Sequence, residues 1–243
     1  MNEQSPGLEA INMKKLALFV GLAGASLLAV NATANTVTFS TASGSTESGG
    51  NPVDATATFT TGANQLTISL TDNLSNPATV AQLISDLDFV LSSGQTSGTI
   101  LSSSGLQRTV NADGTYTVGA VVSTGWGLNN NVAGGLQLDA LGFIGPAGLV
   151  IGGPGAGNLY SAANGSIAGN GPHNPFLYGT INFTLAIAGL TANDTVSSAI
   201  FSFGTTAGDN VTGHTTVPDG GTTAALLGGA LTAAGLLRRK LSV

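Results

Sequence analysis

The sequence predicts an all-β domain, an antiparallel β-sandwich for which a jelly roll is one candidate topology. Several segments alternate apolar and polar residues with a period of two, which is typical of half-buried strands. Turn-forming residues separate these segments, and glycine alone accounts for 36 of the 243 residues. Helical periodicity is nearly absent from the central part of the chain. A fold built mainly from helices is therefore excluded.

The strands follow one another in short runs along the chain. Residues 53–60 and 65–71 alternate, and the residues between them have the composition of a hairpin turn. Thr79 is a candidate N-cap for a short helical turn over residues 80–84. Asn111 to Gly114 indicate a second reversal. The predicted strands are residues 37–39, 53–60, 65–71, 87–91, 109–122, 179–188 and 197–203.

The segment 125–174 has a different composition from the predicted strands. It holds 14 glycines and a single charged residue, Asp139. Such a composition predicts long irregular loops, because glycine weakens both helices and strands. Leu136 and Leu138 could still supply one buried strand or short helix.

The N-terminal residues have the three parts of a secretory signal peptide. Lys14 and Lys15 precede an uninterrupted apolar stretch, residues 16–30, and Ala32 and Ala34 form a small-residue cleavage site. The apolar stretch is shorter than the roughly 20 residues that a permanent transmembrane helix needs. We therefore expect export through the Sec translocon and cleavage by signal peptidase after Ala34.

The C-terminal residues combine a motif, an apolar segment and a basic end. Residues 222–237 are apolar and predict a short transmembrane helix, because a buried core helix would show a polar face. The basic cluster behind it has the composition of a stop-transfer signal. The motif is Val217, Pro218, Asp219, Gly220 and Gly221, and the basic cluster is Arg238, Arg239 and Lys240.

This tail resembles a PEP-CTERM sorting signal, in particular the variant that reads Val-Pro-Asp-Ser-Gly. Gly220 stands where that variant has serine, and Asp219 stands where the commoner form has glutamate. The resemblance implies processing by an exosortase, a membrane-embedded transpeptidase-like enzyme of bacteria that make exopolysaccharide. The protein would be the substrate of that enzyme, crossing the inner membrane and ending at the cell surface or in the extracellular matrix of a biofilm.

Three segments follow from these assignments. Residues 1–34 are the expected signal peptide, with Met13 as the expected true start, because Glu3 and Glu9 are unusual ahead of a signal peptide. Residues 35–216 form one secreted β-sandwich domain, and residues 217–243 form the sorting tail. A domain of this length can bury a sizeable core.

Charge and cysteine content exclude several classes of function. Residues 35–216 contain nine acidic residues and one basic residue, Arg108. Nucleic-acid binding is excluded, since it requires lysine and arginine to neutralise phosphates. The chain has no cysteine, which excludes disulfides, thiol nucleophiles and thiolate metal sites.

Few residues of the domain suggest chemistry. Asp86 and Asp88 share one face of a predicted strand, where they could bind calcium or divide acid and base roles. Trp126 and Tyr160 could stack on sugar rings if exposed. His173 and His214 do not have a metal-ligand spacing, and the expected role of His173 is structural. No cofactor and no catalytic residue is assigned.

The leading prediction is a non-enzymatic exported protein of the cell surface or exopolysaccharide matrix, sorted through its tail. One alternative is an extracellular carbohydrate- or calcium-binding module, for which Trp126 and acidic residues would cluster on an exposed face. A second alternative is a secreted hydrolase, for which Asp86 or Asp88 would face another carboxylate across a cleft.

Overall fold

The computed structural model describes residues 34–142, 147–161, 163 and 165–215. The predicted signal peptide up to Thr33, the sorting motif, the helix 222–237 and the stop-transfer cluster lie outside these residues. Within the described part of the chain, no helix has the length and apolar character needed to cross a membrane.

Strands dominate the described domain, and its two helical segments are single 3₁₀ turns, η1 (Val80–Gln82) and η2 (Ala156–Asn158). The predicted all-β class is therefore confirmed for this part of the chain. The strands are β1 (Thr36–Thr41), β2 (Ala55–Gly62), β3 (Gln65–Asp72), β4 (Ile84–Leu91), β5 (Thr99–Val110), β6 (Tyr116–Val122), β7 (Gly127–Val132), β8 (Gly135–Asp139), β9 (Val150–Ile151), β10 (Phe176–Ala186), β11 (Val196–Phe203) and β12 (Asn210–Thr215).

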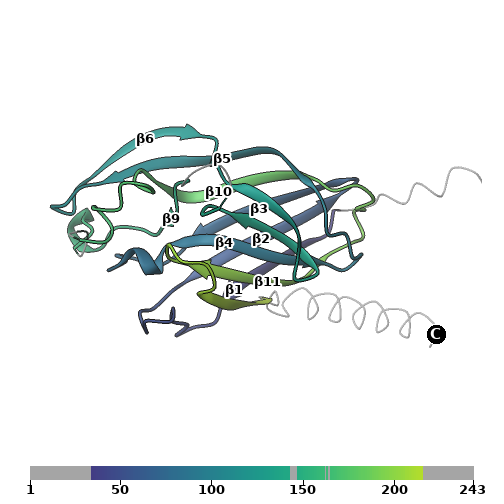
Figure 1. Cartoon of the computed structure of the whole chain (residues 1–243), viewed down its shortest axis with the longest axis horizontal. Coiled ribbons are helices and arrows are strands. Elements are labelled where there is room, and N and C mark those ends of the chain that lie inside the picture. The colour runs from purple at the N-terminus through teal and green to yellow at the C-terminus, as the bar shows by residue number, and fades with distance from the viewer. Residues whose placement is uncertain (1–33, 143–146, 162, 164, 216–243) are drawn as a thin grey trace, which may run out of the picture. The chain divides into compact units, whose positions relative to one another are not determined.

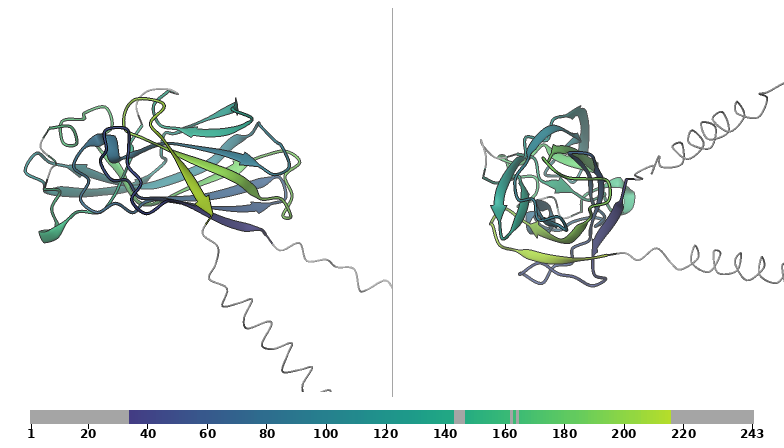
Figure 2. Two further views of the ribbon diagram at one scale, coloured as in Figure 1. Left: turned by 90° about the horizontal axis from the view of Figure 1, so that it is seen from below. Right: turned by 90° about the vertical axis from the view of Figure 1, so that its right-hand side faces the viewer.

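The strands form one continuous sheet with the order β6-β5-β10-β3-β2-β1-β12-β11-β4-β8-β7 (Figure 1). The short strand β9 pairs in parallel with β10 and antiparallel with β4, which joins two strands that lie far apart in this order. The end-on view in Figure 2 shows the strands arranged around a common interior. The two layers of the predicted sandwich are thus parts of a single hydrogen-bonded sheet that folds over one core.

Aromatic side chains connect the two layers inside this core. Phe59 on β2 contacts Phe39 on β1, with ring centroids 5.9 Å apart, and Phe89 on β4, with centroids 5.4 Å apart. Trp126 lies 5.6 Å from Phe183 of β10. These rings are almost completely buried. Strands that lie far apart along the sheet therefore share one apolar interior.

The clearest sequence patterns correspond to observed elements. The predicted hairpin is β2 and β3. Thr79 caps η1: its hydroxyl accepts from the backbone N–H of Ala81, and its own backbone N–H donates to the side-chain oxygen of Gln82.

The prediction that long irregular loops dominate 125–174 was wrong in part, because this segment contains β7 and β9. Leu136 and Leu138 form the buried strand β8, one of the two possibilities expected for them. Two other regions were missed: most of β5, and β12, which runs up to the tail.

Candidate functional site

The two aspartates singled out in the sequence meet a third aspartate on the neighbouring strand. Asp86 and Asp88 lie on β4, and the register of β4 with β8 places Asp86 opposite Asp139 and Asp88 opposite Gln137. Opposed residues of an antiparallel pair have their Cβ atoms about 5 Å apart. Asp86, Asp88 and Asp139 are called the acidic patch below.

Burial and like charge change the protonation of this patch. Asp86 is only 3% exposed. Burial, followed by the hydrogen bond to Asp139 and the charge of that residue, raises the pKa of Asp86 to about 7. Burial also raises the pKa of Asp88, against a hydrogen bond from Gln137. Burial and the neighbouring carboxylate therefore favour the protonated form of Asp86.

Hydrogen bonds from a neighbouring strand and a turn hold the patch together. Asn129 on β7 donates to Asp139 at 2.9 Å and to Gln137 at 2.9 Å. Asp139 also accepts from the backbone of Leu141 and Gly142. Oδ1 of Asp86 and Oδ1 of Asp88 are buried without a partner among the described residues. Those residues contain no group of three or more acidic, histidine or cysteine side chains arranged to hold a metal ion.

A second pair of carboxylates lines a pocket of about 350 Å³ between two loops. Asp209 accepts from the backbone N–H of Ser48 at 2.9 Å and from its hydroxyl at 3.0 Å. Burial raises the pKa of Glu47, but hydrogen bonds from the backbone of Gly49 and Asn51 outweigh it and lower that pKa. Both carboxylates therefore stabilise loops. The sequence analysis missed this pair, because the two residues lie in separate segments and no alternating pattern connects them.

The single base of the domain is buried among all three tyrosines of the chain. The guanidinium carbon of Arg108 lies 3.2 Å from the ring centroid of Tyr178 and 4.1 Å from that of Tyr116. Its Nη1 donates to the hydroxyl of Tyr160 at 2.9 Å, and this hydroxyl donates to the carbonyl of Gly152 at 2.8 Å. Burial raises the pKa of Tyr160 to about 12. The cluster ties the glycine-rich segment to β5, β6 and β10.

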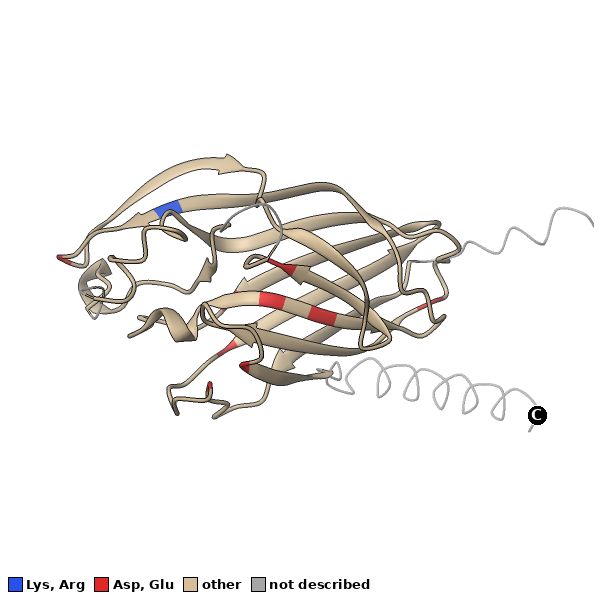
Figure 3. Ribbon diagram, viewed as in Figure 1, with Lys and Arg blue, Asp and Glu red and all other residues tan. Residues whose placement is uncertain are grey.

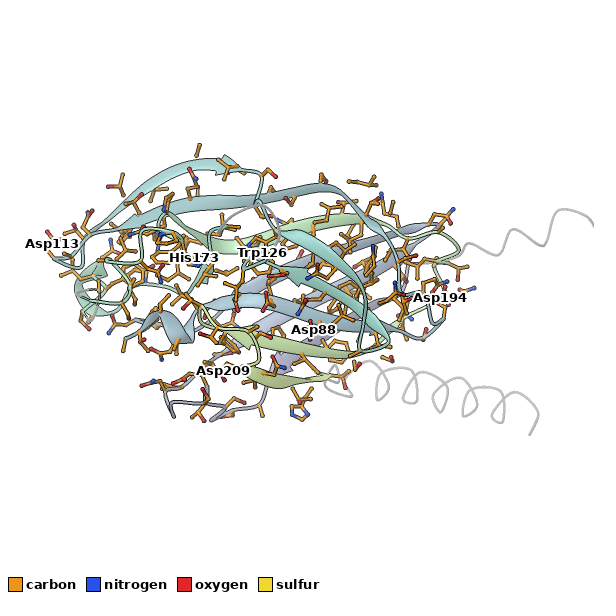
Figure 4. All side chains as sticks on the ribbon, in the orientation of Figure 1. Asp88, Asp113, Trp126, His173, Asp194 and Asp209 are labelled. Carbon is orange, nitrogen blue, oxygen red and sulfur yellow. The ribbon has the colours of Figure 1, made fainter. Side chains whose placement is uncertain are left out.

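The remaining candidate residues are structural in this fold. Trp126 is 5% exposed and Tyr160 is fully buried, so neither can stack on a sugar as considered from the sequence. His173 is also buried, and its Nδ1 lies 2.6 Å from the carbonyl oxygen of Ala147. His214 is exposed on β12. Figure 4 shows Trp126 and His173 within the domain, whereas Asp113 and Asp194 lie at its opposite ends.

The outer side of five adjacent strands carries an uninterrupted array of small hydrogen-bonding side chains. The strands are β1, β2, β3, β10 and β5, and their registers align the array in three rows across the sheet. All members are serine or threonine except one asparagine, and none is charged or apolar. This hydroxyl face consists of Thr36, Thr38, Ser40, Thr56, Thr58, Thr60, Thr67, Ser69, Thr71, Thr180, Asn182, Thr184, Ser102 and Ser104.

Cross-strand hydrogen bonds link many side chains of the hydroxyl face. Thr38 and Thr58 lie 2.9 Å apart, Ser69 donates to Asn182 at 2.8 Å, and Thr71 lies 3.2 Å from Thr180. On β2, β3 and β10 the intervening residues point into the core and are buried. The hydroxyl face was visible in the sequence as threonine or serine at every second position. The sequence analysis used this alternation only to predict strands.

The C-terminal tail is assigned by comparison with known families. Residues 216–241 match the family model of the VPDSG-CTERM motif. The tail is a PEP-CTERM-like sorting signal. The VPDSG-CTERM match covers the predicted motif, apolar segment and basic cluster, despite Gly220 in place of serine. No curated protein and no solved structure matches the chain.

Proposed function

We propose that this chain is a non-enzymatic, exported protein of the cell surface or extracellular matrix, whose VPDSG-CTERM tail is processed by an exosortase. The observation that carries the proposal is the match of residues 216–241 to the sorting motif. In this tail a proline- and glycine-containing motif precedes an apolar segment and a basic end. That order suits recognition at the outer side of the membrane, because the basic end is retained in the cytoplasm.

The acidic residues of the domain support a structural rather than a catalytic role. Asp113 accepts from the backbone and hydroxyl of Thr115, and Asp194 accepts from those of Thr191. Asp139 closes a turn in the same way. These carboxylates satisfy turn backbones that would otherwise lose hydrogen bonds on folding.

The acidic patch is the feature closest to a hydrolase site, since it contains two opposed carboxyl groups and the pKa values of Asp86 and Asp88 are raised. A substrate would have to reach Asp86, which is 3% exposed. The nearby pocket has a volume of about 200 Å³ and is lined by Asp88 as its single carboxylate. Substrate pockets are usually about 300 Å³ or larger. The burial of Asp86 therefore favours the non-enzymatic proposal over hydrolysis.

The decisive experiment follows the tagged protein in its host, with and without the exosortase. We expect a shorter product at the surface or in the medium of the normal host, and a longer membrane-associated form without the enzyme. The variant Pro218→Ala/Asp219→Ala should accumulate as the longer form, whereas Ser242→Ala, outside the matched motif, should be processed normally. Equal size and location in both hosts would overturn the proposal.

A further inference from the structure

We infer that the hydroxyl face is a docking surface for a neutral polysaccharide. The face spans five strands, and its three aligned rows contain only serine, threonine and one asparagine. Other residues border the rows: Leu101 of β5, which is 60% exposed, and Asn73, which hydrogen-bonds to Thr56 and Asp54. An antiparallel sheet exposed to solvent would satisfy its folding requirements with any polar side chains, charged ones included. The exclusion of every charged residue from this array therefore calls for a reason beyond solubility.

The geometry of the array fits a partner with repeated hydroxyl groups. Adjacent strands lie about 4.8 Å apart, and outward residues recur about every 6.8 Å along a strand. Each hydroxyl both donates and accepts a hydrogen bond, as do the hydroxyls of a sugar. Pairs such as Thr38 and Thr58, or Ser69 and Asn182, orient one another and leave further donor and acceptor capacity toward solvent.

The charge distribution selects a neutral polymer. The domain has nine acidic residues, and none of them stands in the three rows of the hydroxyl face; Asp54 borders it, linked to Thr56 through Asn73. Figure 3 shows where acidic and basic residues lie on the described strands and loops. The single base, Arg108, is 5% exposed and cannot pair with an anionic polymer at the surface. An acidic polysaccharide would be repelled by the domain, and a cationic partner would be drawn to the carboxylates elsewhere.

A polymer is favoured over a free sugar because each contact is weak. An exposed hydroxyl that bonds to a sugar gives up a bond to water, so the net gain per contact is small. A chain of linked sugar units engages several rows at once and gains from the high effective concentration of each further unit. The inference rests on the proposed location in the matrix, but it concerns binding rather than sorting.

The test measures binding of the secreted protein, recovered from its host, to named polymers. Affinity electrophoresis through gels containing dextran or hydroxyethyl cellulose should retard the protein, whereas alginate, an anionic polymer, should not. Free glucose at the same concentration of sugar units should fail to release it. Retardation by neither neutral polymer, or equal retardation by alginate, would refute the inference.

Matched variants locate the binding surface. Thr60 and Thr67 are opposed in the β2–β3 register within the face, and Thr109 and Thr117 are opposed in the β5–β6 register outside it. We expect Thr60→Val/Thr67→Val to weaken retention by about tenfold, and Thr109→Val/Thr117→Val to leave it unchanged. Thr58→Glu should abolish retention while the urea midpoint shows that the protein remains folded. Wild-type retention by the face variants would overturn the assignment.

One further measurement separates a polysaccharide from ordered water. If the protein inhibits ice recrystallisation through the same threonines and binds no neutral polymer, the array orders water and the inference is wrong. Failure of polymer binding with normal exosortase processing would refute only this docking surface. Failure of processing with intact polymer binding would refute only the sorting proposal.

Discussion

The hydroxyl face and the acidic patch occupy the same kind of position, the outward side of strands in one continuous sheet, but their environments differ. On β2 and β3 the outward side chains are partly exposed, neutral and hydrogen-bonded to one another. On β4 the outward Asp86 is buried against Asp139. Alternation along a strand thus sets which side a residue faces, whereas neighbouring strands and loops set whether that side meets water.

The largest expected effect comes from breaking the contact between the layers that carry these two regions. Phe59 on β2 contacts Phe39 on β1 and Phe89 on β4. Phe59→Ala leaves a cavity at this junction and should lower the free energy of unfolding by about 3–5 kcal/mol. Urea unfolding followed by tryptophan fluorescence measures the loss. A loss below about 1 kcal/mol would show that the two layers are stabilised independently.

The acidic patch should make stability depend on pH, in a direction set by its raised pKa. Asp86 holds its proton up to about pH 7 in the folded protein, whereas its pKa in the unfolded chain is near the ordinary value of 3.8. The folded state therefore binds more protons between these values, and stability contributed by this group falls as pH rises from about 4 to 7. Above about pH 7, the stabilising contribution of the Asp86 proton to the folded state is lost completely.

The variant Asp86→Asn removes this group from the titration. It should be more stable than the wild type at pH 8, by an amount on the order of 2 kcal/mol, and should lose much of the decline between pH 5 and 8. Asp113→Asn is the matched control, because Asp113 is exposed and its pKa is lowered by hydrogen bonds from Thr115. Urea midpoints at both pH values decide the outcome. An unchanged pH profile in Asp86→Asn would contradict the assignment.

The smallest expected effect belongs to the hydroxyl face. Thr58→Val removes the hydroxyl that bonds to Thr38 at 2.9 Å. Because Thr38 can bond to water instead, the free energy of unfolding should change by less than about 0.5 kcal/mol. The same urea assay gives the change in the free energy of unfolding for Thr58→Val and for Asp86→Asn, so the two values can be compared directly. A loss above about 1.5 kcal/mol would mean that the array is needed mainly for folding.

The sequence predicted the fold class and several strands because alternation is a local property. Leu66, Ile68 and Leu70 were placed on one face, and all three are buried. The strand β7 was missed because glycine and asparagine dominate it, whereas Leu136 and Leu138 had indicated β8 as one of two possibilities, a buried strand or a short helix. The formation of β8 depends on pairing with β4, which is a contact between distant segments.

The candidate sites likewise combine local features that the sequence predicted with contacts between distant segments that it did not. Asp86 and Asp88 were recognised as sharing a face, but Asp139 could join them only through the β4–β8 register. Trp126 and Tyr160 were considered as surface residues, yet the fold buries both. In the same way, Arg108 and its three tyrosines come from segments up to 70 residues apart, so no local pattern could have grouped them.

By itself, the sequence determined the sorting tail, the strand-rich class and the alternation of apolar and polar residues, because each depends on the order of residues within a short segment. Only the tertiary structure decided that one sheet folds over a single core, that Asp86 is buried opposite Asp139, and that serine, threonine and asparagine side chains from five strands form one neutral face. These features depend on registers between distant strands, and the free energy of burying a common core selects those registers.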